Sequence, residues 1–142
     1  MRLALTAESA TGGRSAPKAL AHMAVCLGGC GEGTLYMAPQ GHSIQFEDVQ
    51  FPSTGRVVML TGHLHRYGQR LTLEKLEGSG AGTPRMIWSV TPQGDPNTDS
   101  PLPVWIPPTP LWVTPADRFR LTAEYDNVSG KEWPAMAAIG AY

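Results

Sequence analysis

The sequence lacks several features that mark common classes of protein. No apolar run approaches the roughly 20 residues that a helix needs to cross a bilayer, and the apolar stretch 19–27 is interrupted by His22. The 11 Lys and Arg side chains are matched by 12 Asp and Glu side chains. They form no basic cluster of the kind that binders of nucleic acid or anionic membranes carry. We therefore expect no membrane span and no nucleic-acid partner.

Signatures of common enzyme classes are also missing. The chain has no G-x-S-x-G elbow, no glycine-rich phosphate loop and no H-E-x-x-H motif, so neither a hydrolase nor a nucleotide-binding protein is predicted. At the N-terminus only a few apolar residues follow Arg2 before Glu8. This stretch is too short for the apolar region of a signal peptide, and none is predicted.

Cysteine is scarce, and the two that are present leave the redox state open. Cys26 and Cys30 would be about 13 Å apart in a straight strand, well beyond the roughly 7 Å limit between the Cα atoms of a disulfide. A bridge requires the chain to turn at Gly28 and Gly29. A disulfide and two free thiols are both open, so the cysteines do not define the compartment.

Glycine and proline are abundant, with 16 Gly and 13 Pro in 142 residues. Such a composition favours short strands joined by turns. The clearest strand covers 118–125, where Phe119, Leu121, Ala123 and Tyr125 alternate with polar residues. Further strands are predicted over 3–7, 20–27, 34–37, 42–51, 56–65, 70–77, 85–90 and 135–142.

The spacing of these strands predicts one all-β domain over residues 1–142, built as a sandwich or barrel. Turn residues separate the strands at intervals of about ten residues. The proline-rich stretch 91–110 cannot form a central strand, because proline has no backbone N–H to donate. We expect it to be a surface crossover that Trp105 anchors to the body.

A pair of histidines in one predicted strand is the first candidate for a binding site. His63 and His65 are two residues apart, so both imidazoles leave the same face of the sheet. Imidazole binds Zn, Cu, Fe and Ni, and a useful site needs at least one further donor. The alternative is an ordinary exposed pair of histidines.

The third donor decides which metal is expected. Met136 lies in the predicted terminal strand, and its thioether is a soft ligand that favours copper, above all Cu(I). A methionine in a strand is also a common core residue, and two imidazoles with water would accept zinc instead. His42 is a further candidate, either as an additional metal ligand or as a residue that hydrogen-bonds to a ligand. The alternative is an ordinary exposed histidine at the start of a strand.

Several segments resemble one family of copper enzymes. The segments are 62–68, which contains His-Leu-His, 71–73, 117–127, which contains Tyr-Asp-Asn, and Met136 near Tyr142. Together they are similar to the C-terminal, catalytic-copper domain of the copper type II, ascorbate-dependent monooxygenases, and most of all to small bacterial single-domain relatives. The resemblance covers 34–142. It implies a jelly-roll antiparallel β-sandwich, here of about eight to nine strands, with one copper ion bound by His63, His65 and Met136.

The chain departs from this family in one important respect. The two-domain hydroxylases hold a second copper with three histidines of a preceding domain, whereas only His22 and His42 remain in this sequence. We therefore do not expect the two-copper hydroxylation of the family.

Three functions follow from these observations. The first is a periplasmic or extracellular copper-binding protein in copper handling, with a copper-donor protein as partner. The second is a copper-dependent oxidase or monooxygenase that acts on a small molecule with an external reductant. The third is an interaction module in which the histidine pair is idle.

Overall fold

The computed structural model describes residues 23–27, 36–78 and 83–142. The predicted strand over 3–7, His22 and Cys30 lie outside the described residues. The described residues contain strands and no helix. Among them, no helix long and apolar enough to cross a membrane is found. The prediction of an all-β protein is confirmed.

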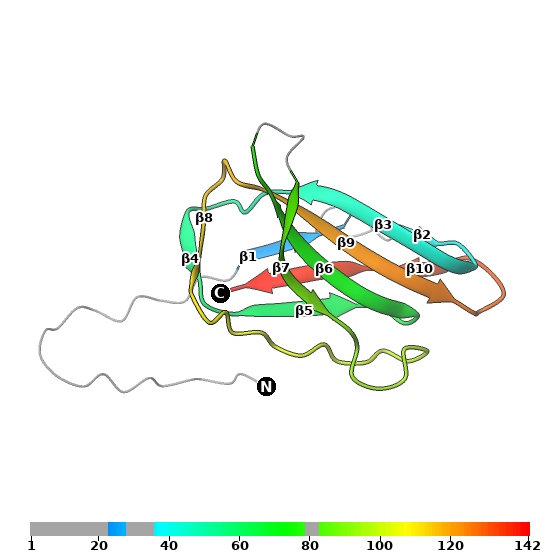
Figure 1. The fold of residues 1–142 in the computed structure, drawn as a ribbon. Coiled ribbons are helices and arrows are strands. Elements are labelled where there is room, and N and C mark those ends of the chain that lie inside the picture. The colour runs from blue at the N-terminus through cyan, green and yellow to red at the C-terminus, as the bar shows by residue number, and fades with distance from the viewer. Residues whose placement is uncertain (1–22, 28–35, 79–82) are drawn as a thin grey trace, which may run out of the picture.

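Two antiparallel sheets form the layers of a β-sandwich (Figure 1). The larger sheet has the order β3-β9-β6-β7 and the smaller the order β1-β11-β5. Two short ribbons, β10-β2 and β4-β8, extend these layers. The strands are β1 (Met23–Cys26), β2 (Tyr36–Ala38), β3 (Gly41–Val49), β4 (Gly55–Val57), β5 (Leu60–Leu64), β6 (Gly68–Leu76), β7 (Pro84–Val90), β8 (Leu111–Val113), β9 (Arg118–Asn127), β10 (Trp133–Ala135) and β11 (Ala137–Ala141).

The core lies between the two sheets and follows from the alternation in their sequences. The four apolar residues of β9, from Phe119 to Tyr125, are at most 1% exposed, as the alternation predicts. Gly62 of β5 shows how closely the sheets approach. A Cβ atom at Gly62 would lie 3.1 Å from Trp88 of β7 and 3.2 Å from Leu71 of β6. The inner face of β5 therefore packs directly against the larger sheet.

Two predicted strands are each divided in the structure. The strand predicted over 56–65 is divided into β4 and β5. Between them the Val58 N–H donates to the carbonyl of the C-terminal residue Tyr142 at 2.7 Å, so the chain changes its pairing partner there. The strand predicted over 135–142 is interrupted at Met136. Before this residue β10 pairs with β2, and after it β11 pairs with both β1 and β5. Met136 is therefore the point at which the chain changes partners.

The crossover predicted over 91–110 has no strand of its own, as expected. Trp105 pairs with Leu60 of β5 through two backbone hydrogen bonds of 2.8 and 2.9 Å, and it packs against the core. The prediction that Trp105 anchors this segment is confirmed. The strand β8, which follows the prolines of the crossover, was not predicted, because three residues are too few to show an alternation.

Candidate metal centre

Strand β5 contains His63, and His65 directly follows the strand, near the outer face of the smaller sheet. Gly62 faces the core and Leu64 is buried, so His63 and His65 point the opposite way. The centroids of the two imidazole rings are 4.9 Å apart, and the ring planes meet at 83°. His63 is exposed and His65 is half-buried. Two potential nitrogen ligands thus lie side by side and are accessible from solvent.

The register between β5 and β11 brings Met136 to the same place. Ala137 pairs with Leu64, so Met136 and His65 are the next opposed pair, and the His65 N–H donates to the Met136 carbonyl at 3.0 Å. Both neighbours of Met136, Ala135 and Ala137, are buried, whereas Met136 is half-buried. Residues directly opposed on neighbouring strands share a face. The thioether therefore belongs to the outer face that carries the histidines.

A buried tyrosine of the larger sheet donates a hydrogen bond to the backbone of Met136. The Tyr125 hydroxyl donates to the Met136 carbonyl at 2.8 Å, so this carbonyl accepts two hydrogen bonds. Tyr125 is 1% exposed. Burial, and to a smaller degree the neighbouring Tyr36, raises the pKa of the Tyr125 phenol, which keeps it protonated as a donor. The sequence predicted only that Tyr125 belongs to the strand over 118–125 and did not reveal this contact.

The ring of His65 has a second contact that bears on metal binding. Its Nδ1 lies 3.5 Å from the Pro134 carbonyl, at the long limit of a hydrogen bond. In the tautomer with a proton on Nδ1, this contact leaves Nε2 as the nitrogen that can bind a metal. A hydrogen bond from the other ring nitrogen is the usual way in which proteins orient a ligating histidine.

Asp99 of the crossover supplies a negative charge beside the histidine pair. Its Oδ1 accepts the Arg66 N–H at 3.0 Å. Partial burial of the ring and repulsion from a charged His65 lower the pKa of His63, whereas Asp99 acts in the opposite direction. The neutral imidazole that ligates a metal is therefore favoured at His63 near neutral pH. Asp99 was missed because only the folded crossover brings it to β5.

The turn after His65 is fixed by contacts with three other segments. Tyr67 has φ of +69°, a left-handed conformation that non-glycine residues adopt rarely. Its N–H donates to the Pro96 carbonyl at 2.6 Å, and its carbonyl accepts the Asp126 N–H at 2.9 Å. The Tyr67 ring meets Trp133 edge to face with centroids 5.2 Å apart. The Arg66 guanidinium lies 5.5 Å from the centroid of the same indole. Trp133 thus adjoins the site.

His42 lies on β3 of the other sheet, exposed and opposite Asp126. Within 23–27, 36–78 and 83–142, no group of three or more His, Cys, Asp or Glu side chains could hold a metal ion. A third protein ligand for His63 and His65 would therefore be of another type, such as the Met136 thioether. Cys26, on β1, is disulfide-bonded, which resolves the open question about its redox state.

His63 in β5, His65 directly after it and Met136 directly before β11 carry two imidazoles and one thioether. These are donor types that Cu(I) and Cu(II) accept. A comparison with models of known protein families finds no match for this chain, and a search of curated proteins finds no relative.

Proposed function

We propose that this chain binds one copper ion through His63, His65 and Met136 and serves in copper handling. The observation that carries the proposal is the hydrogen bond from the His65 N–H to the Met136 carbonyl, one residue beyond the last pair of the β5–β11 ladder, with His63 two residues before His65. Support also comes from the resemblance of 34–142 to the catalytic-copper domain of the ascorbate-dependent monooxygenases, whose jelly-roll fold and ligand set this proposal adopts.

Copper is favoured over zinc by the chemistry of the third donor. A thioether is a soft ligand with a preference for Cu(I), whereas protein zinc sites use Cys, His and carboxylates. The exposure of His63 supports exchange of the ion with a copper-donor protein. The disulfide at Cys26 favours a periplasmic or extracellular location, because structural disulfides persist in oxidising compartments.

A copper-dependent oxidase or monooxygenase is the second candidate. It is favoured by the position of His63 and His65 on the solvent side of the sheet, which leaves room at the metal for oxygen or a small-molecule substrate. An external reductant such as ascorbate would supply the electrons. Oxygen uptake with ascorbate above the rate of free copper would support this function, and uptake equal to that of free copper would eliminate it.

Metal analysis after separate loading with Cu(I), Cu(II) and Zn(II) tests the copper proposal. We expect one tightly held copper per wild-type chain and loss of that copper in His63→Ala and Met136→Ala. Two matched variants serve as controls: His42→Ala, on the other sheet, and Met86→Leu, on β7, retain it. Absence of stoichiometric copper in the wild type would leave the interaction module as the remaining function.

A further inference from the structure

Strand β2 carries a methionine that points to solvent. Met37 lies between Tyr36, whose ring packs 6.2 Å from that of the buried Tyr125, and Ala38, which is 1% exposed. Because side chains alternate along a strand, Met37 points away from the core. Its exposed fraction of 46% agrees with this direction. A thioether is therefore accessible on the surface of β2.

The pairing of β2 with β10 brings Met37 close to Met136. Met37 is opposed to Pro134, and Met136 follows Pro134 by two residues on the same face, since the residues on both sides of Met136 are buried. Met37 and Met136 are therefore diagonal neighbours, about 7–8 Å apart, a separation that long side chains can bridge. The Pro134 carbonyl also lies 3.5 Å from Nδ1 of His65. Met37 thus adjoins the candidate copper site.

The two methionines differ in their access to solvent. Met37 is exposed, whereas Met136 is half-buried. An ion that a donor brings to this face therefore meets the sulfur of Met37 first. A thioether prefers Cu(I), and the unbranched side chain of methionine has three rotatable bonds with which to move its sulfur. Met37 accordingly has both the chemistry and the freedom to pass Cu(I) to Met136.

We propose that Met37 is the entry ligand through which Cu(I) passes from a donor to the site formed by His63, His65 and Met136. This inference rests on the copper function proposed above. A bond from copper to the Met37 sulfur forms as a bond to the donor breaks, and it breaks in turn when the Met136 sulfur binds. The ion stays Cu(I), and no electron is transferred. Met37 is absent from the final ligand set, so it sets the rate of exchange.

Anaerobic stopped-flow mixing of the metal-free protein with the coloured Cu(I) complex of bicinchoninate tests this role. Met37→Leu preserves the volume of the side chain. We expect it to slow the uptake of Cu(I) by about tenfold, as the loss of one stabilising contact in the transition state of transfer would do. An entry ligand acts in both directions, so release of Cu(I) to excess bicinchoninate slows by the same factor. Uptake at the wild-type rate, or slower uptake with unchanged release, overturns the proposal.

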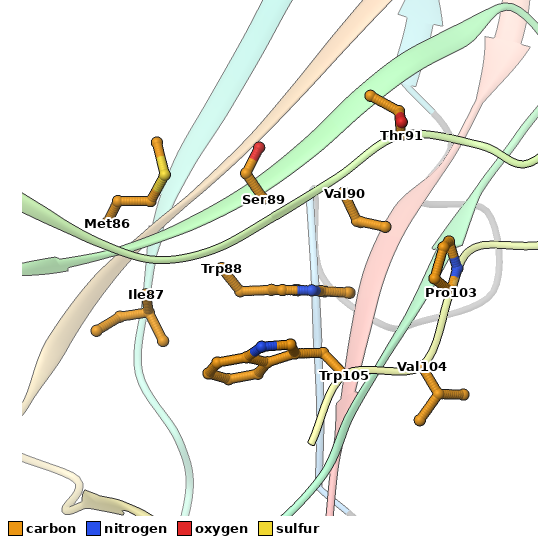
Figure 2. Close-up of a pocket in the computed structure, with 9 residues that line it drawn as sticks. All are labelled: Met86, Ile87, Trp88, Ser89, Val90, Thr91, Pro103, Val104 and Trp105. Carbon is orange, nitrogen blue, oxygen red and sulfur yellow. The ribbon is translucent and has the colours of Figure 1, made fainter. Parts of the chain in front are cut away.

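Met86→Leu is the matched control for the loss of an exposed thioether. Met86 is 60% exposed, more than Met37, but it belongs to β7 of the larger sheet. Figure 2 shows its side chain on the other side of β7 from Trp88. We expect Met86→Leu to take up and release Cu(I) at wild-type rates. If it slows transfer as much as Met37→Leu does, the position of Met37 has no special role and the proposal is wrong.

The outcomes separate the entry role from the copper function itself. A wild type that takes up no copper overturns both, whereas uptake that requires Met136 and is indifferent to Met37 overturns only the entry role. Nuclear magnetic resonance of methyl-labelled methionines gives a readout without a variant. With substoichiometric Cu(I), the methyl signal of Met37 should broaden through exchange, and that of Met86 should keep its width. An unaffected Met37 signal contradicts the proposal.

Discussion

Replacement of Tyr125 by Phe removes the single hydrogen bond that links the larger sheet to the Met136 carbonyl. The aromatic ring and its packing stay, and the hydroxyl that donates at 2.8 Å is lost. The carbonyl still accepts the His65 N–H at 3.0 Å, so it is not left without a partner. We therefore expect the loss of one ordinary hydrogen bond, about 0.5–1.5 kcal/mol in the free energy of unfolding. At about 2–4 °C per kcal/mol for a chain near this length, that corresponds to a fall in Tm of about 1–6 °C.

The same change is expected to affect copper selectively. Because the Tyr125 hydroxyl donates to the backbone of the sulfur donor, we expect Tyr125→Phe to weaken the binding of Cu(I) more than that of Cu(II). Competition titrations with chelators specific for each oxidation state measure both affinities, and urea unfolding measures stability. Tyr36→Phe removes a phenol hydroxyl from the ring that packs 6.2 Å from Tyr125 and serves as the control. Equal loss of Cu(I) and Cu(II) affinity, or none, would refute a positioning role for Tyr125.

Three further predictions concern stability, measured by chemical denaturation of the metal-free protein. Gly68→Ala places a methyl group against the Leu64 side chain and 2.9 Å from the His65 carbonyl, and we expect the free energy of unfolding to fall by about 1–3 kcal/mol. Gly55→Ala, where a Cβ meets nothing within 4 Å, should change stability little, and equal losses in the two variants would contradict this. Asn127 is fully buried, and its amide donates to two backbone carbonyls, at 3.0 and 2.7 Å. Asn127→Ala should therefore lower the free energy of unfolding by about 2–4 kcal/mol, and a loss below about 1 kcal/mol would contradict the importance of these two bonds. Because the pKa of His63 is lowered in the folded protein, the unfolded chain binds a proton at this residue more readily. Stability should therefore fall as the pH drops below 6.5, the ordinary pKa of histidine, and His63→Asn should reduce that fall. An identical pH profile in the variant would exclude a contribution from His63.

A strand could be predicted from its alternation of apolar and polar residues where it stays in one sheet along its whole length. In β9 the apolar residues from Phe119 to Tyr125 face the core throughout, so a period of two was sufficient. The pattern could not reveal that Met136 interrupts its strand. Ala135 and Ala137 on either side are both buried, which preserves the alternation although the pairing partners change. Strand breaks of this kind depend on long-range pairing and leave no local signal.

The candidate site was predictable only in part for the same reason. The His63 and His65 pair is local, and its common face follows from their spacing. The opposition of His65 and Met136 depends on the register between β5 and β11, and Met136 entered the prediction through chemistry and resemblance rather than through geometry. Tyr125 and Asp99 lie beyond the reach of sequence patterns, because each approaches the site from a different sheet or from the crossover.

X-ray absorption at the copper edge of the Cu(I)-loaded protein tests the proposed ligand set, because it reports the atoms bound to the metal. We expect two imidazole nitrogens and one sulfur at the copper. We further expect Met136→Leu, which preserves the volume of the side chain, to remove the sulfur and keep the imidazoles. A spectrum without sulfur in the wild type, or one in which the sulfur survives Met136→Leu, would contradict the proposed site.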